Sequence, residues 1–260
     1  MKLDIYQADA FTSKVFGGNP AALVPLDEWL PDQTLLNIAI ENNLSETAFT
    51  VPQGDKYHLR WFTPGGEVQL CGHATLATAY IMFEELDYEG DVITFSTLSG
   101  DLFVHKTNIG LMMDFPIWER EEIDTPEYVI KAFGKEPIAY FKGNDDMAVF
   151  DDPTFIRRLQ PDLSALKDGN ARGVLVTAPG DEHYDFISRA FFPKLCIDED
   201  PVTGSAHCIL TPYWAQRLNK NKLVAHQASK RGGDLLCELK GDRVEITGQA
   251  AMYMKGEIYV

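Results

Sequence analysis

Residues 74–83 constrain the fold more than any other stretch, because a helix formed by them has almost no polar face. The apolar and aromatic residues here are Ala74, Leu76, Ala77, Ala79, Tyr80, Ile81, Met82 and Phe83. Such a helix is expected to be enclosed on all sides. It follows strand-like residues 58–62, a turn at residues 64–66, and Gly72. A helix N-terminus in this place offers free N–H groups and a positive dipole end to an anion.

A second stretch has the same plan. Residues 198–206 are expected to form a turn that ends in Gly204 and Ser205, and residues 206–215 to continue as a helix that is mostly apolar all round. His73 and Ser205 are 205 − 73 = 132 residues apart. Because strand-like segments flank both helices, the sequence predicts an α+β fold of two similar halves, each with a sheet wrapped around a central helix.

The boundary between the halves is expected just before the polar segment 119–125. The halves are then residues 1–117 and residues 118–260, and the last strand, within residues 251–260, is allowed to return to the first half. Both helix N-termini are expected at a cleft between the halves. Two positive helix ends in one cleft would suit a small carboxylate ligand.

Composition excludes some partners. The net charge of −16 and the pI near 4.7 argue against nucleic acid or an anionic membrane surface, because both would repel the chain. No apolar run is long enough to span a bilayer, and no signal-peptide core follows Met1. We therefore expect a soluble cytoplasmic protein that binds neither nucleic acid nor membrane.

Cysteine and histidine spacing gives no metal signature. The four cysteines are scattered without a C-x-x-C pair, and the six histidines form neither H-x-H nor H-E-x-x-H. Free thiols and no metal or cofactor are expected. Cys71 has two possible roles: a thiol base whose pKa the helix N-terminus lowers, or, more commonly, a buried and inert side chain.

Glu46 is the sharpest single candidate for catalysis. In an expected strand over residues 44–51, Leu44, Glu46 and Ala48 share one face, so the carboxylate has apolar neighbours. Such a setting raises the pKa of a carboxyl group towards the range of proton transfer. The competing interpretation is an ordinary exposed strand residue. His73 could likewise bind substrate or move a proton, or serve only as a helix cap.

Asp200 and Ser205 invite two further interpretations. Asp200 could orient His73, and Ser205 could donate to a substrate carboxylate, although Asp-Pro and Gly-Ser are also ordinary turn and cap sequences. Ser205, His73 and Asp200 together suggest a hydrolase triad. A nucleophile elbow requires G-x-S-x-G, whereas residues 203–207 read TGSAH. A hydrolase is therefore the least favoured function.

Several segments together resemble the PhzF-like phenazine-biosynthesis isomerase family. They are GNPAA at residues 18–22, NLSETAF at 43–49, RWFTP at 60–64, CGHAT at 71–75, EDPVTGSA at 199–206 and SKRGG at 229–233. The resemblance runs from the first expected strand to the last. It implies the diaminopimelate epimerase-like fold, with two halves that each form a β-barrel-like sheet around a central helix.

The resemblance also implies an activity and a set of site residues. It places Glu46 at the acid/base position of a cofactor-free isomerase, assisted by His73 and Asp200. The substrate-binding positions that it implies are Asn19, Gly72, His73, Gly204 and Ser205. It further implies a homodimer. Related epimerases use one thiol from each half, and Cys71 matches the first, but residues 200–204 contain no cysteine. A two-thiol mechanism is therefore not expected.

We expect an isomerase in which Glu46 takes a proton from carbon on a small carboxylic acid and returns it elsewhere. The helix N-termini at His73 and Ser205 would bind the substrate carboxylate. Two alternatives remain open. One is a one-base epimerase or racemase with Glu46 opposed by Cys71 or His73. The other is a non-catalytic ligand-binding protein of the same fold.

Overall fold

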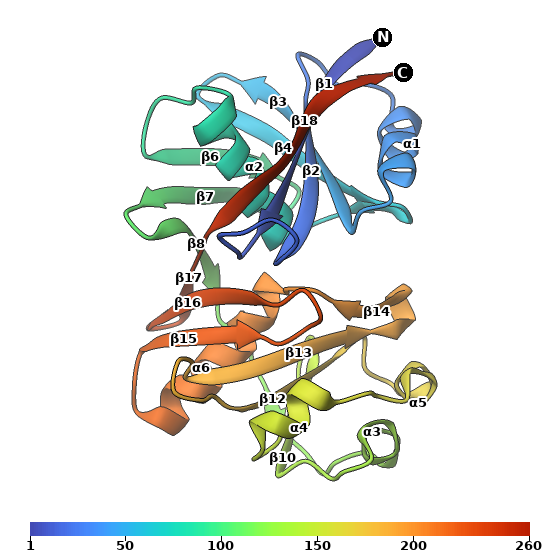
Figure 1. Ribbon diagram of the computed structural model, residues 1–260, viewed down its shortest axis with the longest axis vertical. Coiled ribbons are helices and arrows are strands. Elements are labelled where there is room, and N and C mark those ends of the chain that lie inside the picture. Colours follow the sequence, from blue (N-terminus) through green and yellow to red (C-terminus); the bar gives the residue numbers. More distant parts are fainter. The chain divides into compact units, whose positions relative to one another are not determined.

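Two units divide the chain, and the C-terminal segment belongs to the first of them. One unit contains residues 1–114 and 247–260, and the other contains residues 115–246. The computed structural model describes residues 1–260, shown in Figure 1. The last strand, β18 (Ala250–Tyr259), pairs with β1 (Lys2–Ala10) in register Lys2↔Tyr259, so it is part of the first unit. The structure has no helix with the length and hydrophobicity to cross a membrane.

The first unit adds eight further strands and two helices. They are β2 (Asn19–Pro25), α1 (Asp32–Asn42), β3 (Glu46–Gln53), β4 (Lys56–Thr63), β5 (Gly66–Val68), α2 (Gly72–Glu85), β6 (Val92–Thr97), β7 (Gly100–Thr107) and β8 (Gly110–Pro116), which ends just past the boundary, followed much later by the end of β17 (Arg243–Gly248). Strands β2 and β3 are parallel, as are β4 and β6, whereas the pairs β1–β2, β1–β18, β3–β4, β4–β5, β6–β7 and β7–β8 are antiparallel.

The second unit has more, shorter helices. Its elements are β9 (Glu121–Glu122), α3 (Glu127–Phe133), β10 (Ala139–Lys142), β11 (Asp146–Val149), α4 (Pro153–Arg158), α5 (Leu163–Asp168), β12 (Val174–Pro179), β13 (Phe186–Phe192), the 3-10 turn η1 (Pro193–Leu195), β14 (Ile197–Asp200), the 3-10 turn η2 (Gly204–Ala206), α6 (His207–Leu218), β15 (Lys222–Gln227), β16 (Gly233–Lys240) and most of β17. Helices α3, α4 and α5 lie at one end of this unit (Figure 1).

The two units repeat one topology. Along β1–β2–β3–β4–β6–β7 the successive pairings are antiparallel, parallel, antiparallel, parallel and antiparallel, and β10–β11–β12–β13–β15–β16 gives the same order. The short strands β5 and β14 pair antiparallel with the fourth strand of each series. Helices α2 and α6 each cross over between the fourth and fifth strands. The predicted pair of similar halves is confirmed.

Helix α2 is enclosed, as its composition predicts. Ten of its 14 residues are buried, and it packs against β1, β2, β3 and β18. Helix α1 covers the other face of these strands through Leu35, Ile38 and Ala39. Because β2 is covered on both faces, its residues 21–24 are all buried, and it reads as a continuous apolar run rather than an alternating one.

Helix α6 contains a proline in its interior. Pro212 has no N–H to donate to the carbonyl of Cys208, and an unsatisfied buried carbonyl would be costly. The backbone N–H of Trp118 instead donates to the Cys208 carbonyl at 3.0 Å. Nine of the 12 residues of α6 are buried, so this long-range hydrogen bond supports a helix that water does not reach.

One predicted element differs from the structure. Residues 198–206 were expected to form a turn throughout, but Ile197–Asp200 is strand β14, which pairs with β13. Three consecutive acidic residues are unusual in a strand. Here Arg189 of β13 binds Glu199 through two hydrogen bonds, Nε to Oε1 at 2.6 Å and Nη2 to Oε2 at 2.9 Å. Pairing with a buried arginine therefore overrides the local propensity.

A buried hydrogen bond anchors α6 to the sheet and gives a stability prediction. Nε1 of Trp214 donates to Oγ1 of Thr177 at 2.9 Å, and both side chains are fully buried. Thr177→Val would leave the indole N–H without a partner and should lower the free energy of unfolding by about 1–3 kcal/mol. Urea denaturation followed by circular dichroism measures this. The exposed Thr154→Val of α4 is the matched control, and equal losses in both variants would contradict the assignment.

Candidate functional site

In the first unit, Glu46 and His73 form a close pair. Glu46 begins β3 and His73 is the second residue of α2, and Oε2 of the carboxylate lies 3.1 Å from Nε2 of the ring. Their side chains are only 13% and 7% exposed. In such a setting the interaction is screened little by water. The pair places a carboxylate beside the N-terminus of the enclosed helix.

Asn19 positions the other side of the imidazole ring. Its Nδ2 lies 3.2 Å from Nδ1 of His73, and both side chains are buried. With this amide N–H donating to Nδ1, the neutral ring carries its proton on Nε2, the atom that faces Oε2 of Glu46. Asn19 follows Gly18, whose φ is +59° and where a Cβ would lie 2.0 Å from the carbonyl oxygen of Ala10. Only glycine fits this turn.

The charge of Glu46 changes the proton affinity of His73. Burial by itself lowers the pKa of this ring, but the negative charges that Cys71 and Glu46 can place beside it raise the pKa well above its ordinary value. If the ring accepts a second proton, Nδ1 becomes a donor, and Asn19 would have to turn its Oδ1 towards it. Protonation of His73 and the orientation of Asn19 are therefore coupled.

Cys71 does not behave as a helix-activated thiol. It is the N-cap residue of α2, with Sγ 3.5 Å from Nδ1 of His73. Burial first, and then the charge of Glu46, raise its pKa to about 11. The expectation that the helix N-terminus lowers this pKa is wrong, because the thiol is buried beside a carboxylate. The alternative of a buried, protonated cysteine fits the structure.

Donor atoms of Glu46, Cys71 and His73 all lie within 4.8 Å of one another. These three side chains of the first unit could each offer one ligand atom to a metal ion. Binding through sulfur would require the Cys71 thiol to lose its proton. Because the pKa of that thiol is raised to about 11, the protonated form dominates at neutral pH and opposes such binding.

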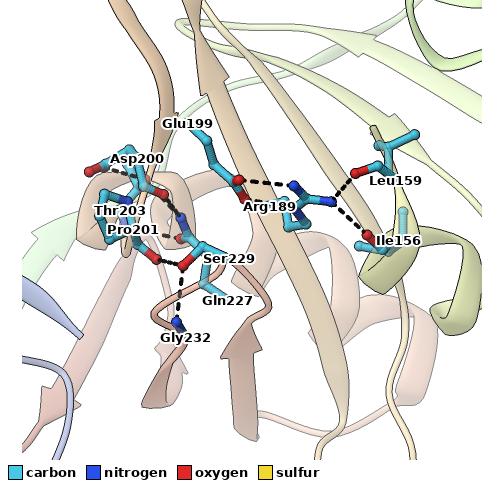
Figure 2. A network of polar contacts seen from close by, with 10 residues as sticks. All are labelled: Ile156, Leu159, Arg189, Glu199, Asp200, Pro201, Thr203, Gln227, Ser229 and Gly232. Carbon is cyan, nitrogen blue, oxygen red and sulfur yellow. Dashed lines mark hydrogen bonds and ion pairs between the residues drawn. The ribbon is translucent and has the colours of Figure 1, made fainter. Parts of the chain in front are cut away.

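In the second unit, Gln227 holds the loop between β14 and η2. Its Oε1 accepts a hydrogen bond from the backbone N–H of Thr203 at 2.8 Å. Its Nε2 donates to the carbonyl of Asp200 at 2.8 Å and to Oγ1 of Thr203 at 3.2 Å. Gln227 is fully buried, so both ends of this loop are fixed by one side chain that water does not reach (Figure 2).

Asp200 is oriented by the same network. Oγ1 of Thr203 donates to its Oδ2 at 2.5 Å. The loop is held at a third point, where Oγ of Ser229 donates to the carbonyl of Pro201 at 2.7 Å and accepts from the N–H of Gly232 at 3.0 Å (Figure 2). Asp200 is half-buried, so a carboxylate in a set orientation remains accessible.

Gly204 and Ser205 begin the turn that leads into α6. Gly204 is buried and Ser205 is half-buried. Next to them, His207 is completely buried, and its Nδ1 lies 3.0 Å from the carbonyl of Thr203. Burial lowers the pKa of His207 to about 4, so the ring is neutral at pH 7 and donates this hydrogen bond from Nδ1. His207 therefore fixes Thr203 from the helix side.

The predicted site residues form two groups. Asn19, Glu46 and His73 are in mutual contact through His73, with Gly72 next to it in the first turn of α2. Asp200, Gly204 and Ser205 belong to the second unit, where Thr203 and its partners hold their loop. The sequence did not predict Gln227 or His207 as residues that hold this loop. His207 directly follows the TGSA segment, which was a usable signal, whereas nothing in the sequence marks Gln227 as a loop anchor.

Comparisons with known proteins agree over nearly the whole chain. A family model described as phenazine biosynthesis-like protein matches residues 8–256. An uncharacterized isomerase of Pseudomonas aeruginosa is 49% identical over 260 residues and covers 100% of both chains. The crystal structure of a PhzF-family phenazine biosynthesis protein from Enterococcus faecalis superposes with a TM-score of 0.97 at 48% identity, covering 100% of both chains.

A more distant structure shares the fold alone. The crystal structure of a hydroxyproline epimerase from Agrobacterium vitis has a TM-score of 0.62 at 11% identity, covering 99% of this chain and 92% of that one. Together with the repeated topology of the two units, these structures confirm the predicted α+β, diaminopimelate epimerase-like fold.

The environment of Cys71 gives a prediction about thiol reactivity. A pKa raised from 9.0 to about 11 reduces the thiolate population roughly 100-fold at neutral pH, and burial also blocks access. Iodoacetamide should therefore modify the exposed Cys196 and leave Cys71 unmodified in the folded protein. Peptide mass spectrometry at pH 7 measures both in one sample. Modification of Cys71 as fast as Cys196 would show that its thiol is activated.

Proposed function

The chain belongs to the phenazine biosynthesis-like family and is an isomerase, and from this premise we propose that Glu46 moves a proton on a small carboxylic acid. The observation that carries the proposal is the contact between Glu46 and His73, with Nε2 of the ring 3.1 Å from Oε2 of the carboxylate. A largely buried carboxylate with a set hydrogen-bond partner fits an acid/base role. The reaction needs no redox step and no cofactor.

In the proposed reaction Glu46 acts first as a base and then as an acid. Its carboxylate removes a proton from carbon, and the electron pair of the broken C–H bond moves into a neighbouring π system. The resulting carboxylic acid returns the proton to a different carbon, which completes the isomerisation and restores the carboxylate. Because Oε2 of Glu46 faces Nε2 of His73 at 3.1 Å, we assign the transfer to Oε1 of Glu46.

Helix N-termini are proposed to bind the substrate carboxylate. The backbone N–H groups of Gly72 and His73 are in the first turn of α2, where an α-helix has no internal acceptors. In the second unit, Gly204 and Ser205 occupy the equivalent place before α6, and we propose that they bind substrate while Asp200 assists by hydrogen bonding. Such contacts would offset the negative charge that makes proton removal beside a carboxylate harder.

Epimerisation is the nearest alternative within the isomerases. It would need a second acid/base group on the opposite face of the substrate carbon. Cys71 is poorly suited, because burial and the charge of Glu46 raise its pKa to about 11. A partner thiol is also missing from residues 200–204. These two observations count against a thiol as the second group and leave His73 as the candidate for it in an epimerase.

Glu46→Gln tests the catalytic assignment. Glutamine keeps the shape and can still accept a hydrogen bond from His73, but it cannot take a proton from carbon. We expect proton exchange on an active carboxylic acid to fall by about 10²–10⁴-fold, measured by proton NMR in D2O. Glu41→Gln removes the same charge from an exposed position on α1 and is the matched control. Wild-type exchange in Glu46→Gln would contradict the proposal.

The position of the label in D2O distinguishes the two reaction types. If Glu46 relocates a proton, the double bond should shift, and any deuterium that enters from exchange at the Glu46 acid should appear at the carbon that gains hydrogen. If the enzyme is an epimerase, deuterium should appear with inversion at the original carbon. Two-dimensional NMR and chiral chromatography of the product of an active acid separate these results, and inversion without a shifted double bond would refute relocation.

A further inference from the structure

A hollow on the second unit has an unusual charge. It has a volume of about 410 Å³, and Arg157, Arg158 and Lys230 lie in its lining. The chain as a whole has 39 acidic and 23 basic residues, so the expected neighbour of a cation in this protein is a carboxylate. With Arg189, four cations line one hollow against that balance, and they come from three separate segments: the end of α4, strand β13 and the loop after β15.

Two of these cations have no ion pair. Arg157 binds Asp181 with Nη2 and Oδ2 2.7 Å apart, whereas Arg158 and Lys230 are exposed and form no hydrogen bond or ion pair within the chain. The one acidic residue in the lining is Glu199, and both of its oxygens are bound to Arg189, at 2.6 and 2.9 Å. The positive charge of the hollow is therefore not neutralised by its own walls.

The wall behind these cations is held by several hydrogen bonds. Arg189, with a side chain only 11% exposed, donates from Nη1 to the carbonyls of Ile156 at 3.1 Å and Leu159 at 2.5 Å, besides its two bonds to Glu199 (Figure 2). It thereby fixes the end of α4, which carries Arg157 and Arg158. Ser229, beside Lys230, is bound to Pro201 and Gly232. The backbone on both sides of the hollow is thus set before any ligand arrives.

We propose that this hollow is a binding site for a small oxyanion with two or more negative charges, such as a phosphate group or a compact polycarboxylate. Guanidinium groups match the geometry of phosphate and carboxylate oxygens. A single negative charge would gain little from exposed cations in salt solution, so a multivalent anion is required. The net charge of −16 excludes a large polyanion, because the rest of the surface would repel it.

The hollow is connected to the candidate site through the chain. Glu199 directly precedes Asp200, and Ser229 holds the carbonyl of Pro201. The residues that would bind the oxyanion are nevertheless different from those proposed to bind substrate. Binding at the hollow can therefore be measured without turnover, and its failure would say nothing against Glu46.

Calorimetric titration of the full chain tests the proposal, with inorganic phosphate in one arm and citrate in the other. At an ionic strength of about 0.01 M, where screening is weak, we expect saturable binding with a Kd on the order of 1 mM or tighter. The double variant Arg158→Ala with Lys230→Ala should weaken binding at least about 10-fold, because it removes two charge-assisted hydrogen bonds. Neither side chain has a partner in the chain, so folding should be unaffected.

A second double variant controls for net charge. Lys142→Ala with Lys167→Ala removes two exposed cations of the same unit from outside the hollow and should leave the affinity unchanged. Saturation by phosphate alone identifies a phosphoryl ligand, by citrate alone a polycarboxylate, and by both a site for either anion. The absence of saturable binding, or equal weakening in the two double variants, would overturn the proposal.

Discussion

The burial of a helix that has no polar face is the constraint on which each unit depends. Such a helix cannot lie on a surface without exposing apolar area to water, and a twisted sheet that curves around it removes that area. In the first unit, β1, β2, β3 and β18 provide this cover for α2. Strand β18 pairs with β1 along its length and supplies part of this cover, so the C-terminal residues return to the N-terminal unit.

Enclosure creates a second requirement, since the backbone ends of a buried helix need partners. The starts of the two central helices differ in this respect. No side chain caps α2, and buried Asn19 and His73 with half-buried Glu46 form a polar cluster beside its first N–H groups. Before α6, Gln227 and His207 hold the backbone of Thr203 directly. One unit therefore places titratable groups at its helix start, whereas the other places a fixed loop there.

The pKa directions follow from how these groups are surrounded. Cys71, His73 and His207 are all buried, yet the pKa of His73 is raised while that of His207 is lowered to about 4. The difference is a neighbouring negative charge: Glu46 lies beside His73, whereas His207 lies beside the backbone of Thr203 and the ring of Phe186. Burial alone disfavours charge on an imidazole, and a nearby carboxylate reverses that effect. The ring of His73 therefore holds a second proton more readily than the ring of His207.

The sequence by itself determined the enclosed helices, the repeated α+β halves, and Glu46 and His73 as candidates. These features depend on local periodicity and on short contiguous motifs, both of which are visible in the sequence. It did not show that Ile197–Asp200 is a strand, that Cys71 has a raised pKa, or that Gln227 anchors the loop at Thr203. Each of these depends on partners far away in the chain: Arg189 for the strand, Glu46 for the thiol, and β15 for the loop. Tertiary structure alone decides which buried polar atoms come into contact. Hydrogen bonds and charge interactions depend on the distance between atoms in space, and the periodicity of the sequence does not report that distance.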